Sequence, residues 1–249
     1  KNLKKMKNPK ILIAGCGTGR QSIQAASRYK NSDILAIDIS LKSLSYAKRK
    51  SQELGYENIK YMQADILDLE KLNDKFDIIE CTGVLHHMAD PVAGWKVLSN
   101  LLKVQGLMKI GLYSKLARQE IITIRNEINK LNINYNEMAM RNFRSDIIKS
   151  VKPHHKSILN SDDFYSMSSF RDLLFHIHES HFSLIEIQKY LNDLNLRFSG
   201  FEGCPKISEF KYENSVNEDL YDLKKWDHFE KKNKYTFEGM YQFWCQKLK

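Results

Sequence analysis

A buried apolar run followed at once by three closely spaced glycines constrains this chain more than any other feature. Residues 10–14 are typical of a buried strand, and Gly15, Gly17 and Gly19 follow directly, before a helix start at Arg20. Glycine has no Cβ and adopts positive φ, so a ligand can lie against the backbone of such a turn. The free N–H groups and the positive end of the helix then face that ligand. The pattern predicts a nucleotide-type cofactor site in an open α/β sheet.

The spacing of these glycines argues against one class of cofactor. The dinucleotide fingerprint G-x-G-x-x-G uses its third glycine for close packing of the helix on the strand. Here that position holds Arg20, whose bulk and charge fit the role poorly. From the glycines alone, a tight turn without a ligand is the alternative interpretation.

Acidic residues follow the next two predicted strands. Residues 34–37 lead to Asp38, and residues 59–63 lead to Asp65 and Ile66. A carboxylate at the tip of the second strand can accept both cis-hydroxyls of a ribose, which suits NAD and S-adenosylmethionine alike. A helix N-cap is the alternative role for Asp38. Asp65 can bind the exocyclic amine of adenine while Ile66 packs against its ring.

Two further strands are predicted at residues 76–81 and 107–113, the second preceded by a break at Gln105–Gly106. With them, the chain resembles a class I S-adenosylmethionine-dependent methyltransferase over residues 10–113. Four segments carry this resemblance in the family's order: residues 15–19, 36–38, 63–65 and 84–91. Residues 171–176 and 237–244 carry a narrower resemblance, to the methyltransferase domain of bacterial tetratricopeptide-repeat methyltransferases.

The resemblance implies an α/β fold with a seven-stranded, mostly parallel Rossmann-like sheet whose last strand is antiparallel. It also implies that the glycine turn lines the methionine part of S-adenosylmethionine, that Asp38 holds the ribose with Ile39 against the adenine, and that Asp65 holds the other edge. The residues implied in cofactor binding are Gly15, Cys16, Gly17, Thr18, Gly19, Asp38, Ile39, Asp65, Ile66, Cys81, Thr82 and Gly83. For Cys16 itself, a small packed side chain is the expected role.

Histidines after the fourth strand are the candidate catalytic groups. His86 and His87 lie where the family places residues near the transferred methyl, and an imidazole can remove a proton near neutral pH. A structural role in the loop before Pro91 is an equal alternative for each. Candidate substrate-side residues, on position alone, are Tyr113, Arg171 and His176.

The remaining histidines do not predict a metal site. His176 and His178 diverge by about 200° on a helix, so they cannot easily share one ion. Asp172 and His176 are four apart and can share a face, but such surface pairs are common without a metal. We therefore expect no metal ligands.

About 70 residues separate the fifth strand from the resumed core pattern, far more than a crossover needs. Helices are predicted at residues 117–131, 143–151 and 170–178, and they form an expected helical insertion, 115–182, that caps the substrate. A dimerisation or packing element is the alternative. The core would comprise a cofactor-binding half, 1–114, and the remainder, 183–249. In the latter we expect a helix at 183–191, a strand at 196–201, an amphipathic helix at 219–231 and the last strand at 239–246.

Composition sets limits on partners. Hydrophobic residues make up 42% of the 249, enough for a core. No apolar run approaches a membrane span, and four scattered cysteines form no disulfide framework, so we expect a cytoplasmic protein. The net charge of +9 is spread as lysines along the predicted helices, which argues against a nucleic-acid partner. The chain opens with a basic stretch and no methionine, and the narrower resemblance puts a helical-repeat module upstream.

Together these observations predict transfer of a methyl group from S-adenosylmethionine to an N, O or S atom of a small-molecule acceptor. A base is needed only if that atom starts protonated. The alternatives are an RNA or protein methyltransferase and a non-catalytic domain that binds the cofactor. An NAD-dependent enzyme is the weakest option.

Overall fold

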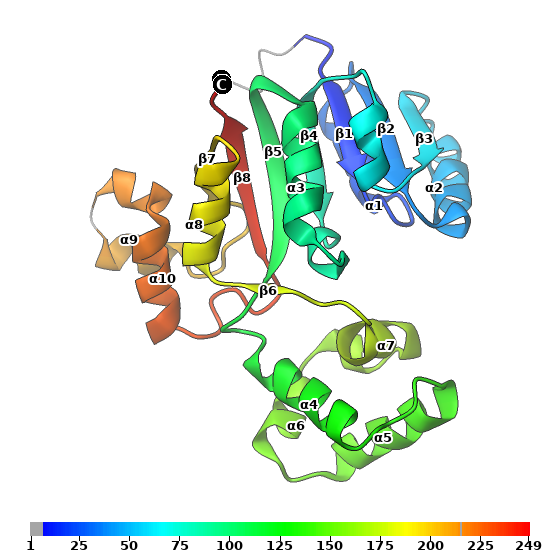
Figure 1. The fold of residues 1–249 in the computed structure, drawn as a ribbon, viewed down its shortest axis with the longest axis vertical. Coiled ribbons are helices and arrows are strands. Elements are labelled where there is room, and N and C mark those ends of the chain that lie inside the picture. Colours follow the sequence, from blue (N-terminus) through cyan, green and yellow to red (C-terminus); the bar gives the residue numbers. More distant parts are fainter. Residues whose placement is uncertain (1–6, 215) are drawn as a thin grey trace.

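A twisted sheet forms the centre of the computed structural model, which describes residues 7–214 and 216–249 (Figure 1). The first six residues of the basic opening stretch lie outside the described residues. The sheet order is β3-β2-β1-β4-β5-β8-β7. Its long strands are β1 (Lys10–Ala14), β2 (Asp33–Asp38), β3 (Ile59–Gln63), β4 (Phe76–Thr82), β5 (Leu102–Ser114), β7 (Leu196–Phe201) and β8 (Tyr241–Lys247).

Strand directions confirm the predicted fold class. The first five strands are parallel, while β8 runs antiparallel to both β5 and β7. A two-residue strand, β6 (His181–Phe182), adds a short parallel pairing to β5 that the sequence did not predict. The architecture is the mostly parallel, Rossmann-like methyltransferase sheet.

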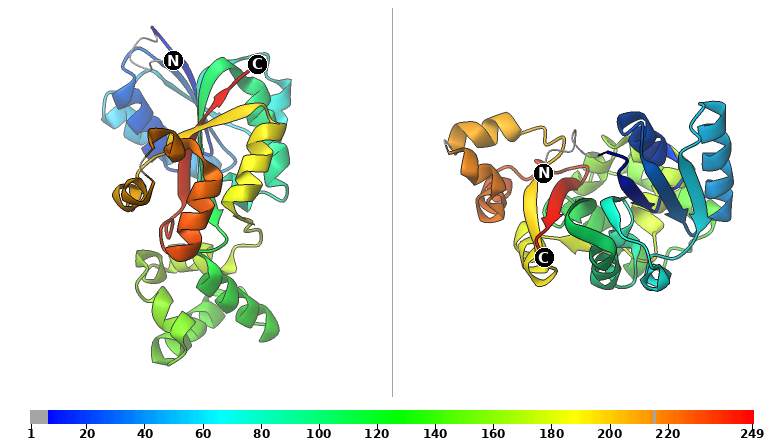
Figure 2. Two further views of the ribbon diagram at one scale, coloured as in Figure 1. Left: turned by 90° about the vertical axis from the view of Figure 1, so that its left-hand side faces the viewer. Right: turned by 90° about the horizontal axis from the view of Figure 1, so that it is seen from above.

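Helices cover both faces of this sheet (Figure 2). Side chains alternate across a strand, so Ile11 and Ile13 pack in one hydrophobic cluster and Leu12 and Ala14 in another. The first cluster includes side chains of α1 (Arg20–Arg28) and α2 (Leu41–Glu53). The second includes side chains of α3 (Pro91–Leu101), α8 (Leu184–Asp193), α9 (Ile207–Glu213) and α10 (Leu223–Lys232).

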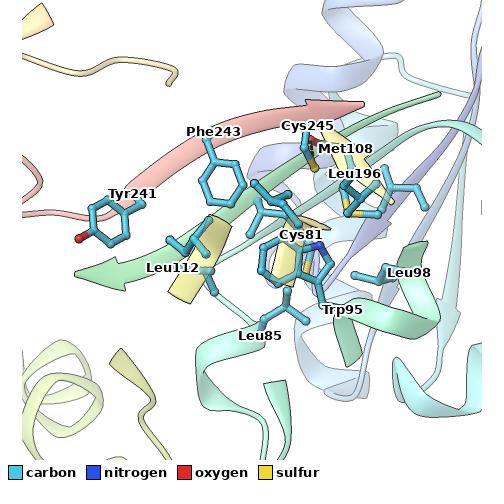
Figure 3. Packing of buried hydrophobic residues seen from close by; sticks show 14 of the residues in the cluster. Cys81, Leu85, Trp95, Leu98, Met108, Leu112, Leu196, Tyr241, Phe243 and Cys245 are labelled. Atoms are coloured by element: carbon cyan, nitrogen blue, oxygen red, sulfur yellow. Dashed lines mark hydrogen bonds between the residues drawn. The ribbon is translucent and has the colours of Figure 1, made fainter. Parts of the chain in front are cut away.

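The larger cluster contains the main core of the molecule. Figure 3 shows Trp95 of α3 beside Cys81, Leu85 and Leu98, beneath strands β5 and β8. Trp95 is 1% exposed. Burial of such a side chain contributes on the order of 2–3 kcal/mol, so this cluster anchors the ends of β4 and β5, where the candidate site lies.

Four helices lie below the sheet, at the carboxyl ends of its parallel strands (Figure 1). They are α4 (Gln119–Lys130), α5 (Glu137–Lys149), α6 (Pro153–Ile158) and α7 (Met167–Phe175). They share a hydrophobic cluster of their own, which includes Ile124, Phe143 and Phe170. The chain therefore leaves the sheet after β5, forms a small helical unit and returns to the sheet through β6.

Two helices of this insertion begin earlier than the sequence predicted. Helix α5 begins at Glu137 rather than Phe143, because the Asn136 side chain accepts from the amide of Ala139 and caps it. Helix α7 begins at Met167 because Ser166 caps it in the same way, and it ends at Phe175, before His178. The polar caps, rather than the spacing of apolar residues used in the prediction, therefore set where these helices begin.

Two other boundaries were also wrong. The helix predicted over 219–231 is divided at Asp222, whose carboxylate accepts from the amides of Lys224 and Lys225 and caps α10; a short 3-10 turn, η5 (Asn217–Tyr221), precedes it. Strand β5 begins at Leu102 rather than at Leu107, but its pairing is irregular at the predicted break: Phe76 pairs with Leu102 and Ile78 with Leu107, and Gln105 has φ +62°. A Cβ at Gly106 would lie 2.7 Å from the carbonyl oxygen of Lys103, so glycine is required there.

Candidate active site

The glycine turn between β1 and α1 has the predicted left-handed backbone. Gly15, Gly17 and Gly19 have φ of +75°, +51° and +93°. A Cβ on Gly15 would lie 2.2 Å from Val84, and one on Gly19 would lie 2.7 Å from Ala47. A Cβ on Gly17 would meet nothing within 4 Å. Packing therefore requires the outer two glycines, whereas Gly17 faces open space at the mouth of the turn.

Asp38 ties this turn to the second strand. One oxygen of its carboxylate accepts from the amide of Gly17 at 2.8 Å, and the other accepts from the amide of Ser40 at 2.9 Å. Each carboxylate oxygen can accept a further hydrogen bond. Ser40, and not Asp38, caps α2, because the Ser40 hydroxyl accepts from the amide of Ser43. The alternative role of helix cap is thus taken by the neighbouring residue, and Asp38 remains available to a ligand.

An apolar side chain stands in solvent beside this carboxylate. Ile39 is 71% exposed, an unusual position for isoleucine, and a flat ring could cover it. Asp65, which follows β3, accepts from the amide of Leu67 through one oxygen and has the other free of hydrogen bonds among the described residues. Ile66 is 5% exposed and packs in the main core, so its side chain supports this region from beneath.

Unsatisfied polar atoms gather at the tip of β4. The hydroxyl oxygen of Thr82 and the side-chain carbonyl oxygen of Gln21 are both buried without a hydrogen-bond partner among the described residues. The Gln21 amide nitrogen donates to the Thr82 carbonyl oxygen at 3.4 Å. Met240 closes this region, because its sulfur would lie 2.6 Å from a Cβ placed on Gly111. Buried polar groups without partners are rare in native proteins, so a polar ligand is expected here.

The two cysteines of the predicted set point into the protein. Cys16 and Cys81 are 5% and 0% exposed. Burial raises the pKa of each thiol to about 12, and the charge of Asp38 contributes for Cys16. Thr18, in contrast, is exposed at the turn. Cys16 packs in the core as expected, and neither thiol is ionised near neutral pH.

The predicted catalytic and substrate-side rings form one row of tilted and edge-on contacts. Tyr113 of β5 lies 3.9 Å from His86 between ring centroids, His86 lies 4.4 Å from His87, and His87 lies 3.9 Å from His176. His86 and His87 belong to the 3-10 turn η3 (Leu85–His87), and His176 follows α7. The row therefore connects the sheet to the insertion, which sequence spacing could not show.

His86 is closed off from solvent. It is 0% exposed, and both of its ring nitrogens lack hydrogen-bond partners among the described residues. Burial lowers the pKa of His86 to about 3, with the neighbouring His87 acting in the same direction. The ring is neutral at physiological pH. Burial lowers the pKa of His87 as well.

A buried cluster of charged side chains lies beside this row and was not predicted from the sequence. The Glu179 carboxylate accepts from His181 at 2.7 Å and pairs with Arg118 and Arg125 at 3.9 and 3.7 Å. Arg118 also lies over the Tyr113 ring at 3.3 Å. Burial opposes ionisation of Glu179, but the hydrogen bond from His181 and the two arginines outweigh it and lower its pKa. No local motif marks Glu179, because its partners come from α4 and β6.

A cleft of about 730 Å³ lies between the insertion and the sheet. Ile121 and Leu173 line it from the insertion, Cys204 and Phe237 line it from the segments around α9 and β8, and Met240 connects it to the tip of β4. Its charged lining residues are Arg118, Glu120, Asp163, Glu202 and Glu238. Arg171 does not line this cleft; it lies on the outer side of α7, in a separate hollow with Asp172 and His176.

Most of these charges are paired. Glu120 accepts from Lys234 at 2.6 Å, and Glu202 accepts from Lys109 at 2.9 Å. Asp163 and Glu238 make no hydrogen bond or ion pair through their carboxylates within residues 7–214 and 216–249. The cleft therefore has an excess of unneutralised negative charge.

Comparisons with known proteins agree with this geometry. The family described as "Methyltransferase domain" matches residues 5–171. An uncharacterized protein of Synechococcus is 39% identical over 114 residues, which cover 45% of this chain and 27% of that protein. A ubiquinone biosynthesis O-methyltransferase of Glaesserella parasuis is 32% identical over 120 residues, covering 46% of this chain and 50% of that enzyme.

Among solved structures, PKMT2 from Rickettsia typhi in complex with AdoHcy superposes with a TM-score of 0.70 at 18% identity. The match covers 97% of this chain, the insertion included, and 49% of that chain. At this identity the likeness concerns the fold. The chain spans half or less of the length of each of these three proteins. No helix within residues 7–214 and 216–249 is long and apolar enough to cross a membrane.

Proposed function

Because this chain belongs to the methyltransferase domain family, we propose that it binds S-adenosylmethionine and transfers a methyl group to a nucleophilic N, O or S atom of a small-molecule acceptor. The observation that carries the proposal is the joint placement of the Gly17 turn, the Asp38 carboxylate and the unpaired Thr82 and Gln21 oxygens. Bound S-adenosylmethionine supplies an electrophilic methyl on a sulfonium, with the corresponding thioether as leaving group.

The chain's own residues hold and orient that cofactor. The remaining acceptor capacity of Asp38 suits the two ribose hydroxyls, and exposed Ile39 and the free oxygen of Asp65 suit the face and the amine of adenine. Gly17 leaves room for the amino-acid portion. Thr82 and Gly83 at the end of β4 then lie beside the reacting methyl, where Gln21 offers an oxygen to the positive sulfonium.

The insertion is the proposed cap over the acceptor. Its cleft of about 730 Å³ falls in the usual range for small-molecule sites. Met240 lines that cleft and also packs at the β4 tip, so an acceptor held in the cleft lies next to the site proposed for the transferred methyl. Unpaired Asp163 and Glu238 favour an acceptor that carries a positive charge, such as an amine, over a phosphate-bearing polymer.

An amine acceptor must lose a proton before its lone pair can attack. His86 is buried and neutral, because burial lowers its pKa to about 3. A neutral, buried imidazole of this kind suits a role in positioning the neighbouring rings. The prediction that His86 or His87 removes the proton remains a prediction. The upstream helical-repeat module and the cytoplasmic location also remain predictions.

Titration calorimetry with S-adenosylhomocysteine and with NAD tests the cofactor assignment. We expect binding of the first alone, and a severe loss in Asp38→Ala. Asp33→Ala is the matched control, because Asp33 lies at the opposite end of the same strand and should leave binding unchanged. Equal affinity of Asp38→Ala and the parent chain would remove the ribose assignment.

A methyl-transfer assay with labelled S-adenosylmethionine then tests the acceptor. Small cationic amines, neutral alcohols and thiols, RNA and protein are compared, and transfer to the amines is the expected result. Transfer to RNA or protein alone would replace the small-molecule proposal. Binding of the cofactor without transfer to any of these classes would favour a non-catalytic domain.

A further inference from the structure

Three metal-ligating side chains converge where the insertion meets the core. His87 comes from η3, and Asp172 and His176 come from one face of α7 and its end. One ligand atom from each residue lies within 4.8 Å of the other two. Because His87 is 85 positions away from Asp172, sequence spacing does not reveal it as a third ligand. The expectation of no metal ligands considered Asp172, His176 and His178, and not His87.

Hydrogen bonds define which ring nitrogens are free. The Nδ1 atoms of His87 and His176 both contact the backbone carbonyl oxygen of His178, at 3.1 and 2.7 Å. A carbonyl oxygen only accepts, so each Nδ1 carries a proton and each Nε2 has a free lone pair. The amide of His178 lies 3.3 Å from the His176 Nδ1 and would donate to that nitrogen in the opposite tautomer; the 2.7 Å contact with the carbonyl oxygen is the shorter of the two and favours a proton on Nδ1. Metal-binding histidines are typically oriented in this way, by donation of the other ring N–H to a carbonyl.

The carboxylate of the group is also available. Asp172 is exposed and makes no hydrogen bond or ion pair within the described residues. Arg171 lines the same hollow of about 360 Å³ without forming an ion pair with Asp172. Arg125 donates to the His176 carbonyl oxygen, and its guanidinium shares the Glu179 carboxylate with Arg118. Asp172 is therefore free to bind a cation beside the two imidazoles, one nitrogen of each lying within 4.8 Å of the other ligand atoms.

A second group of the same composition shows the contrast. Glu127 lies within ligand distance of His154 and His155. There both imidazoles use Nε2 to contact the carboxylate, at 2.9 and 2.8 Å, and Lys152 donates to it at 2.9 Å. The possible ligand atoms are already hydrogen-bonded to one another, and the Lys152 ammonium lies where a metal ion would have to bind. This second group is a hydrogen-bonded ion-pair cluster.

We propose that the Nε2 atoms of His87 and His176, with the Asp172 carboxylate, bind a divalent transition metal ion of the zinc type. Two imidazoles and one carboxylate form a set that Zn²⁺ accepts in tetrahedral geometry, with the fourth position left to water or a ligand. Zinc–ligand bonds of about 2.0–2.2 Å require the three donor atoms to approach to roughly 3.3 Å of one another. Exposed Asp172 can approach by changing rotamer, and the His87 and His176 rings must also turn so that their nitrogens point to one ion.

The ion would join two parts of the fold. His87 follows the β4 tip and contacts His86 edge-on, whereas Asp172 and His176 belong to the insertion. A metal held between them would stabilise the insertion against the core and hold the cap in one position. Binding would also withdraw the His87 lone pair from proton transfer. The proposal is independent of the proposed function, because it concerns ligands outside the cleft.

Metal binding to the tag-free, chelator-treated chain tests this proposal. Titration calorimetry with ZnCl₂, followed by the thermal midpoint of unfolding with and without Zn²⁺, should give one equivalent bound and a higher midpoint. Cobalt(II) in place of zinc should give the visible absorption of a four-coordinate ion. His176→Ala and Asp172→Asn should each weaken binding by at least about tenfold, because loss of even an outer-sphere partner costs 10–100-fold.

His154→Ala is the matched control, because it alters the other histidine cluster of the insertion. It should keep one equivalent of metal and the same cobalt spectrum. The exposed Asp172→Asn variant covers the case in which His176→Ala fails to fold. Absence of saturable binding, unchanged affinity in Asp172→Asn, or loss of binding in His154→Ala would each overturn the proposal, whatever the methyl-transfer assay shows.

Discussion

The hydroxyl of Ser114 donates a 2.6 Å hydrogen bond to the buried carboxylate of Glu230. Ser114 is the last residue of β5, and its oxygen also accepts from the amides of Leu116 and Ala117, where the chain turns into the insertion. The other Glu230 oxygen accepts from Tyr241 at 2.6 Å. Burial raises the pKa of Glu230. The Glu230 carboxyl on α10 therefore holds in place both the first residue of β8 and the end of β5, from which the chain continues into the insertion.

Ser114→Ala should destabilise the chain by about 1–3 kcal/mol, because it leaves a buried carboxyl oxygen and two backbone amides without their partner. Urea unfolding followed by circular dichroism measures the change. Ser45→Ala is the control, since Ser45 is exposed and donates only within α2. A Ser114→Ala midpoint equal to that of Ser45→Ala would contradict the structural role of this hydrogen bond.

Gly17→Ala and Gly55→Ala should separate backbone strain from ligand contact. Both glycines have positive φ, and a Cβ on either meets nothing within 4 Å. Each substitution should cost about 1–2 kcal/mol of stability, the penalty of a left-handed alanine. Only Gly17→Ala should weaken binding of S-adenosylhomocysteine, by at least about tenfold, or about 1.4 kcal/mol. Equal binding by the two variants would place the ligand away from the turn.

Thr82→Val should leave the stability of the free chain unchanged, because the hydroxyl it removes has no hydrogen-bond partner. Thr236→Val removes a buried hydroxyl that donates to the Asn233 carbonyl oxygen at 2.6 Å, and should cost about 1 kcal/mol. Binding of S-adenosylhomocysteine should fall in Thr82→Val and not in Thr236→Val. We would abandon the polar-ligand interpretation of the β4 tip if the two variants behaved alike.

Stability should fall with acidification below about pH 6.5. Burial depresses the pKa of His86 to about 3 in the native state, so the unfolded chain binds a proton that the native chain does not. The His86 contribution is complete above the unfolded pKa and is lost toward pH 3, at about 1.4 kcal/mol per pH unit. His86→Phe keeps the stacking on Tyr113 and should reduce the pH slope by about one proton. An unchanged slope in urea titrations from pH 7 to pH 4 would exclude this assignment.

Periodic and local features were predictable from the sequence. The bounds of β3 and β7 agree with the predicted segments, because short apolar runs between turn residues leave little freedom of register. The left-handed turn at Gly17 was equally predictable, because only glycine adopts it at low cost. Helix starts in the insertion were misplaced, since the caps at Asn136 and Ser166 decided them.

Contacts between distant segments were decided by the tertiary structure alone. Tyr113, His86, His87 and His176 were each singled out from the sequence, but nothing in their spacing predicts that their rings lie in one row. The same holds for Glu179 and its two arginines. The sheet, the glycine turn and the acidic strand ends could be predicted from the residues alone, because these features depend on neighbours along the chain. Only the folding of the insertion against the carboxyl ends of the strands decided the cleft and the proposed metal ligands, because such contacts arise from the packing of surfaces far apart along the chain.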